Sequence, residues 1–136
     1  MIGLNGKMVR IVSFLIAVSW FGNCDAQNLK LELIRTFNGH NHGVRHVVFS
    51  PDGSHFASGG TRGEVFIWDI EGSAALKKLE GHYGSVTDVS YSENGSYVVT
   101  AGDDGQIKVW DSETGFCHKR IISPTNEESP INKVRF

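Results

Sequence analysis

The sequence has few cysteines, and this scarcity limits the kinds of domain that it can encode. Its 136 residues contain two of them, Cys24 and Cys117, and no C-x-x-C pair. Two cysteines are too few for a disulfide framework, which needs several bridges. A single bridge between them would form only in an exported chain that keeps residue 24.

Charge of one sign and long apolar runs are also lacking. The 13 Lys and Arg residues nearly balance the 15 Asp and Glu residues, and the formal net charge is −2. This balance gives no indication of nucleic-acid binding through bulk charge. The apolar run at residues 11–21 is too short to span a bilayer comfortably, and no other segment could do so. No membrane span is therefore expected.

Glycine and short β-branched segments make up much of the rest. The chain has 16 glycines and few helix-favouring runs, which is typical of a turn-rich β protein. One stretch opens with Gly81-His82 and closes with Trp110-Asp111. Inside it, turns rich in Gly, Asn and Asp separate three short segments at 86–91, 97–101 and 107–110. This pattern predicts an antiparallel meander.

The same skeleton occurs 42 residues earlier, from Gly39-His40 to Trp68-Asp69. A period of about 40–45 residues with Gly-His and Trp-Asp ends is the signature of a WD40 propeller blade. Over about residues 29–136 the chain therefore resembles the WD40-repeat family, since two copies agree in spacing as well as in residue type. The resemblance implies an all-β fold: a partial β-propeller of two four-stranded antiparallel blades plus flanking strands, not a closed ring.

The chain is expected to divide into five parts. Residues 1–26 read as a signal-like or non-native leader, because Lys7 and Arg10 precede the apolar run and small residues at Cys24 and Ala26 suggest a cleavage site. Residues 27–38 are expected to be a strand of a preceding blade. The two repeats cover 39–80 and 81–122. Residues 123–136 are read as a linker and the first strand of a truncated third repeat.

Eight strands are predicted within the two repeats. In the first repeat they are expected near residues 44–50, 56–58, 65–68 and 75–79, and in the second near 86–91, 97–101, 107–110 and 116–121. Gly53, Gly95 and Gly105 lie in the connecting turns, where glycine tolerates the positive φ of tight hairpins.

In the WD40 family, a His, a Ser or Thr, an Asp and the Trp of each blade form a buried hydrogen-bond relay. The second repeat has His82, Thr100, Asp104 and Trp110 at these positions. Their chemistry is compatible with such a relay, because the indole donates, a hydroxyl and a neutral imidazole both donate and accept, and a carboxylate accepts. A fully paired set of buried polar groups rigidifies a fold.

The first repeat has His40, Ser58 and Trp68 at the matching positions, but Arg62 occupies the position of the Asp. A guanidinium only donates, so it cannot accept a hydrogen bond from His40. The first blade is therefore predicted to be the looser of the two, and a change of Arg62 to Asp is expected to stabilise it.

Two catalytic or metal-binding alternatives are weaker. A hydrolase would use Thr100 with His82 and Asp104, but the sequence has no G-x-S-x-G or comparable motif, and the relay recurs in both repeats. The run of His40, His42 and His46 has no equivalent in the second repeat, and His42 is expected in a loop. No metal and no other cofactor is therefore expected.

The resemblance implies a non-catalytic scaffold module that displays its loops to protein or peptide partners. Tyr and Arg are enriched in binding hot spots, and the candidate partner-binding residues are Arg62 and Tyr83, followed by His42, Arg45 and Asp103. The alternative is a secreted or periplasmic structural β-propeller protein. The family resemblance favours the cytoplasm or nucleus, whereas a true signal peptide would favour the secretory pathway.

Two blades cannot close a ring, which typically takes 4–8. Apolar residues are therefore expected to be exposed at both flanks: Val44, Val47 and Phe49 on one, and Phe116, Ile121 and Val134 on the other. Such faces favour association. The chain is expected to be part of a longer product or to self-associate through its open blade faces.

Overall fold

The computed structural model describes residues 34–72, 74–123 and 130–136. The predicted leader at 1–26, the beginning of the flanking segment at 27–33 and most of the predicted linker, at 124–129, lie outside the described residues. No described residue belongs to a helix, so no helix there is long and apolar enough to cross a membrane.

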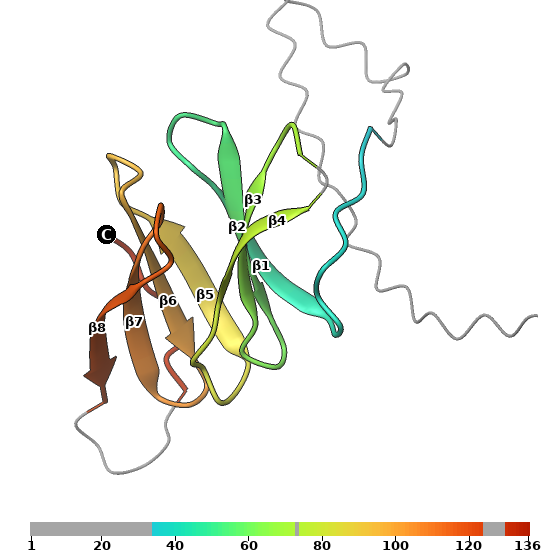
Figure 1. Ribbon diagram of the computed structural model, residues 1–136. Helices are drawn as coiled ribbons and strands as arrows, with labels where there is room; N and C mark the ends of the chain where they lie inside the picture. The colour runs from blue at the N-terminus through green and yellow to red at the C-terminus, as the bar shows by residue number, and fades with distance from the viewer. Residues whose placement is uncertain (1–33, 73, 124–129) are drawn as a thin grey trace, which may run out of the picture.

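The described chain folds into two separate antiparallel sheets (Figure 1). The first sheet has the order β1-β2-β3-β4 and comprises β1 (Val44–Phe49), β2 (His55–Gly60), β3 (Val65–Asp69) and β4 (Ala75–Leu79). The second has the order β5-β6-β7-β8 and comprises β5 (Val86–Tyr91), β6 (Tyr97–Gly102), β7 (Gln106–Asp111) and β8 (Cys117–Ile122). These two four-stranded meanders, which do not close into a ring, confirm the predicted fold class.

All eight predicted strands are present, and β2 differs most from the prediction. It continues through Gly59 and Gly60, beyond the predicted end at residue 58. Close packing requires glycine at both positions: a Cβ added at Gly59 would lie 2.5 Å from a methyl carbon of Val86 in the second sheet. A Cβ at Gly60 would lie 2.7 Å from His40 Nδ1. These glycines admit a neighbouring sheet and a neighbouring side chain.

The main core lies between the two sheets. The first sheet contributes residues from β2, β3 and β4, and the second contributes residues mainly from β5 and β6. The buried members are Ala57, Val65, Ile67, Leu79, Val86, Val89, Tyr91, Val98 and Trp110. Burial of apolar area of this kind is the main favourable term in folding, so each sheet depends on the other for its stability.

A second cluster covers the opposite face of the first sheet. It consists of Phe56, Phe66, Trp68 and Phe37. The Phe37 and Phe56 rings meet edge to face with centroids 4.8 Å apart, an arrangement that aromatic pairs favour. Phe37 therefore ties the segment before the first repeat to the first sheet.

The flanking segments are not strands in their described parts, which corrects the prediction for 34–38 and 131–136. Residues 34–38 have no described strand beside them with which to form a ladder, and they are held instead through Phe37 and Arg35, whose guanidinium donates to the carbonyl of Ile70. Residues 131–136 contact the second sheet through isolated hydrogen bonds, such as the one that Ile131 N–H donates to the Gly102 carbonyl at 3.1 Å.

The outer face of β1 shows what a neighbouring blade does. Val89 and Tyr91 on β5 are 3% and 9% exposed because the first sheet covers them. Val47 and Phe49 occupy the matching positions on β1, 42 residues earlier, and are 47% and 46% exposed. The same strand position is therefore buried in one blade and open in the other.

Candidate functional site

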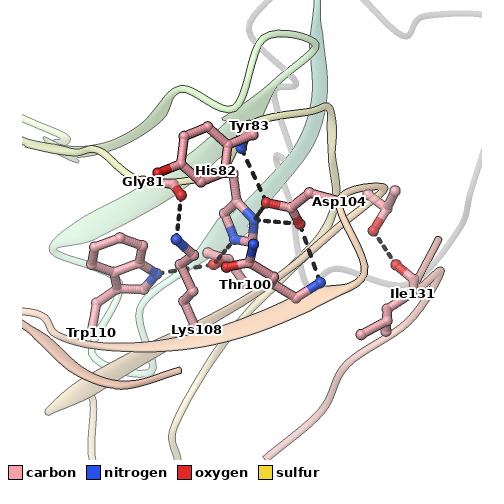
Figure 2. A network of polar contacts seen from close by, with 10 residues as sticks. Gly81, His82, Tyr83, Thr100, Asp104, Lys108, Trp110 and Ile131 are labelled. Carbon is pink, nitrogen blue, oxygen red and sulfur yellow. Dashed lines mark hydrogen bonds and ion pairs between the residues drawn. The ribbon is translucent and has the colours of Figure 1, made fainter. Parts of the chain in front are cut away.

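The second blade contains a continuous chain of hydrogen bonds (Figure 2). The Trp110 indole Nε1–H on β7 donates to Thr100 Oγ1 on β6 at 2.9 Å, and Thr100 Oγ1 lies 2.7 Å from His82 Nε2. His82 Nδ1 lies 3.0 Å from both carboxylate oxygens of Asp104. An acceptor at Nε2 and a donor at Nδ1 satisfy every member, so the neutral imidazole carries its proton on Nδ1.

Asp104 is the last acceptor in this series of hydrogen bonds, and it organises the turn between β6 and β7. Its carboxylate accepts the backbone N–H of Tyr83 at 3.0 Å and that of Gln106 at 3.2 Å, in addition to His82. Burial opposes ionisation of Asp104, but these hydrogen bonds outweigh it and lower its pKa. Burial lowers the pKa of His82, against the opposing effect of Asp104. An ionised Asp104 therefore faces a neutral His82.

The first blade repeats most of this arrangement. Trp68 Nε1–H donates to Ser58 Oγ at 2.8 Å, and Ser58 Oγ lies 2.7 Å from His40 Nε2. Arg62 is exposed. Glu64, two residues further along, places Oε2 3.5 Å from His40 Nδ1.

Glu64 corrects the expectation that the first blade has no acceptor for its His. The separation of 3.5 Å is longer than a good hydrogen bond, and neither His40 Nδ1 nor Glu64 Oε2 has a hydrogen-bond partner among the described residues. Burial lowers the pKa of His40, and Glu64 only partly offsets this. The first relay thus has a carboxylate at its end, but a more distant one than the second.

The turns at the ends of the two blades meet and form a shared rim. A Cβ added at Gly63 would lie 2.2 Å from the carbonyl oxygen of His82 and 3.0 Å from that of Gly84, and Gly63 has a φ of 77°. Only glycine suits this left-handed position at such close approach. The Ser85 hydroxyl also donates to the Thr61 carbonyl at 3.0 Å. The two blades are therefore joined at their turns.

This junction brings together the turns that carry Arg62 and Tyr83, the two leading partner-binding candidates. Both side chains are exposed, Tyr83 to 86%. Asp103 lies on the other side of Gly84, where an added Cβ would be 1.8 Å from Asp103 Oδ1. Arg45 is exposed on β1, and His42 is half-buried in the preceding loop. The rim residues thus lie on both sides of the blade junction.

Lys108 contacts the segment that carries Tyr83 from inside the blade, a role that the sequence pattern did not reveal. It is buried on β7, and its ammonium donates to the Gly81 carbonyl. The same Nζ lies 5.9 Å from the centroids of the Tyr83 and Trp110 rings (Figure 2). Cation–π attraction at this distance is favourable, so Lys108 links the exposed Tyr83 to the buried Trp110.

Asp88 is a further residue whose role the sequence analysis missed. Its carboxylate is almost fully buried on β5 and lies 3.2 Å from His46 Nδ1 on β1. It also accepts the Val134 N–H at 2.9 Å and pairs with the Arg135 guanidinium at 2.8 Å. His46 and Asp88 are 42 residues apart, so the repeat period shows that they occupy equivalent positions in the two blades. The period does not show that the two side chains are in contact.

The hydrolase and metal hypotheses find no matching geometry. Thr100 is fully buried, and its hydroxyl is engaged by both Trp110 and His82, so a substrate carbonyl could not reach it. His40 faces Ser58, whereas His46 faces Asp88. No group of three or more metal-ligating side chains occurs within residues 34–72, 74–123 and 130–136.

Comparison with known protein families gives two matches within the chain. The model of the family described as WD domain, G-beta repeat matches residues 31–69 and 73–111. Both matched segments end at the Trp-Asp pair that closes β3 or β7. Together they cover more than half of the sequence.

One curated relative is the small ribosomal subunit protein RACK1y of Oryza sativa subsp. japonica. It is 39% identical over 67 residues, which are 48% of this chain and 20% of the relative. Among solved structures, the β-propeller domain of Cps50 (Swd1) from Myceliophteria thermophila is 28% identical, with a TM-score of 0.62 over 68% of this chain. The RRP9 WD40 repeats are 20% identical, with a TM-score of 0.61 over 64% of it, and show likeness of fold. The chain spans 28% of each solved structure.

The two relays should differ in their response to loss of the indole donor. Trp110→Phe leaves the fully buried Thr100 with one partner fewer, which should lower the free energy of unfolding by about 1–3 kcal/mol. Trp68→Phe should cost less, because the carboxylate in the first relay is more distant and the new ring stays among Phe37, Phe56 and Phe66. Urea unfolding of both variants measures the difference. Equal losses would contradict the ranking.

Stability should also fall in mild acid. Burial lowers the pKa of His40 and of His82 in the folded chain, so both stay neutral at a pH at which the unfolded imidazoles, with a pKa of about 6.5, take up protons. The stability that the two neutral imidazoles contribute is therefore complete above the unfolded pKa and is lost as the pH falls towards their pKa values in the folded chain. The urea midpoint should be lower at about pH 5 than at about pH 7.5, and His82→Gln should reduce this difference.

The matched control for this pH dependence is His118→Gln, because His118 is exposed on β8. This change should leave the dependence as it is. An unchanged midpoint between the two pH values, or an equal effect of the two substitutions, would show that the buried imidazoles are not responsible.

Proposed function

The chain belongs to the WD40-repeat family, and on this premise we propose that it is a non-catalytic scaffold module that binds protein or peptide partners through its rim. The rim consists of residues 41–45, 61–63, 82–84 and 103–105. The observation that carries the proposal is the junction of the two blades, where the turns of Arg62 and Tyr83 pack against each other and both side chains face solvent.

The rim has the rigidity and the residue types that a binding surface needs. Tyr83 N–H is held by Asp104, and Asp104 in turn by the buried relay, so this turn is ordered before a partner arrives. Preorganisation of this kind reduces the entropic cost of binding. Tyr and Arg are enriched among binding hot spots. The rim therefore combines an ordered backbone with exposed anchor side chains.

A non-catalytic role is supported by the use of the polar groups. Thr100, His82 and Asp104 satisfy one another inside the blade, and a nucleophile that is fully buried cannot meet a substrate. The rice relative is by name a protein of the small ribosomal subunit, and a role within a large assembly supports protein partners here. The alternative of a secreted structural propeller depends on the leader at 1–26, which lies outside the described residues.

Site-specific photocrosslinking tests the rim as the binding surface. A photoreactive phenylalanine analogue in place of Tyr83 should give discrete crosslinked products in an extract of cells that produce the chain. The matched control is the same analogue in place of Leu76, which is also an exposed apolar residue, at 47%, but lies on β4, outside the rim and outside the open blade faces. Equal crosslinking at both positions, or none at Tyr83, would contradict the proposal.

We further propose that the open face of β1 binds another blade, supplied by a second copy when the chain is expressed alone. The support is the internal contrast between Val89 and Tyr91, which the first sheet covers, and the exposed Val47 and Phe49 at the same positions. The apolar residues Ile107, Val109 and Ile121 of the second sheet match Val65, Ile67 and Leu79, which cover β5. Copies would therefore associate head to tail.

Analytical ultracentrifugation tests this association. The 136-residue chain should sediment as oligomers, and a double change of Val47 and Phe49 to Ser should shift it towards the monomer, because association through apolar area is lost. The change Leu76→Ser, which alters an exposed apolar residue on β4, serves as the control. A monodisperse monomer with a sharp two-state thermal transition would contradict the proposal.

A further inference from the structure

We propose that the blade junction on the rim selects acidic peptide segments, with Arg45 and Arg62 as the anion-binding groups and Tyr83 as the adjoining apolar anchor. This inference rests on the proposed function and names the chemistry of the partner at the same surface. It depends on three observations: where the two guanidinium groups lie, which nearby charges are already paired, and how Tyr83 is supported.

Arg45 projects from an irregularity in β1. Val44 pairs with Gly60 and His46 with Gly59, so Arg45 has no opposing residue and forms a β-bulge. Bulges redirect a side chain and commonly occur beside functional sites. In β5 the bulge residue is Thr87, and its hydroxyl reaches forward to the Ile131 carbonyl of the next segment. Arg45 is the equivalent bulge residue of β1. By the same geometry its side chain extends towards the second blade and the junction.

Arg62 lies close to this position through the paired turn. Thr61 N–H donates to the Gly43 carbonyl at 2.9 Å, which joins the turn of Arg62 to the loop that leads into β1. Gly63, on the other side of Arg62, packs against the backbone on either side of Tyr83. Arg62 therefore lies between the start of β1 and the turn of Tyr83.

The carboxylates of this region leave both guanidinium groups unneutralised. Asp88 pairs with His46 and Arg135, Asp104 accepts from His82, and Glu64 Oε2 lies 3.5 Å from His40 Nδ1 without a hydrogen bond. Neither Arg45 nor Arg62 has an ion-pair or hydrogen-bond partner in the described part of the chain. The first-blade side of the rim thus presents two free cations that a carboxylate can bind in a bidentate manner.

Tyr83 supplies the second half of the recognition. Its ring is almost fully exposed, but the Lys108 ammonium beneath it and the bond from its N–H to Asp104 hold its position. An exposed ring that is held in place offers apolar contact at low entropic cost. A peptide with an acidic residue next to an aromatic or aliphatic one would therefore match the junction.

A nucleic acid fits the rim less well than an acidic peptide. Nucleic-acid binding is driven by several phosphate contacts along a basic stripe. The rim offers two guanidinium groups here, Asp103 lies beside Gly84 on the same rim, and the chain has a formal net charge of −2. A short acidic segment needs only the two cations and tolerates a carboxylate at the far side.

Fluorescence anisotropy with two labelled peptides tests the proposal. One probe is a fluorescein-labelled peptide with Glu and Asp on both sides of a central Phe, and the other has Gln and Asn in their places. The acidic probe should bind at least tenfold more tightly. Each of Arg45→Gln and Arg62→Gln should weaken that binding about tenfold, as for loss of a charge-assisted hydrogen bond, with little effect on the neutral probe. Arg120→Gln on β8 is the matched control and should change neither.

Equal affinity for the two probes would overturn the proposal, as would an equal loss with Arg120→Gln. A single-stranded homopolymeric RNA that competes more strongly than the unlabelled acidic peptide would also overturn it and would indicate a nucleic-acid partner. The photocrosslinking at Tyr83 separates this outcome from failure of the proposed function. Specific crosslinks with no acidic preference would reject the acidic peptide and retain the rim, whereas an absence of crosslinks would reject the rim itself.

Discussion

The hydrogen bond from the Trp110 indole to Thr100 is the interaction on which the second blade depends most. It joins β7 to β6, and His82 extends it to the segment before β5 and to the turn that holds Asp104. Buried polar chains of this kind are stabilising only when each member is paired. Because Asp104 also holds the backbone of Tyr83, the order of the exposed rim follows from pairing inside the blade.

Much of this architecture could be predicted from the sequence, because it is local to one repeat. The 42-residue spacing, the alternation within each strand and the turn glycines locate all eight strands. The relay of His82, Thr100, Asp104 and Trp110 is equally local: each residue lies at a set distance from the others along one meander. The resemblance to the WD40 family implied the relay and its order, and donor and acceptor chemistry is compatible with that order.

The features that sequence reasoning missed are contacts that spacing does not encode. Glu64 provides the carboxylate of the first relay because a longer side chain, two residues beyond the expected position, can reach back to His40. Gly59 lies within β2 at a point where any Cβ would collide with Val86 of the second sheet. Asp88 joins β1, β5 and residues 134–135. Each of these depends on how two segments approach in space, which a pattern within one repeat cannot specify.

The most direct test of the account is hydrogen exchange of the Trp indole N–H groups, followed by NMR at neutral pH. If the relays are the buried ties of the two blades, the Nε1–H signals of Trp110 and Trp68 should persist long after the exposed backbone amides have exchanged, and that of Trp110 should persist longer. Rapid exchange of the Trp110 signal, at the rate of an unprotected indole, would contradict the account, because Thr100 would then not be its lasting acceptor.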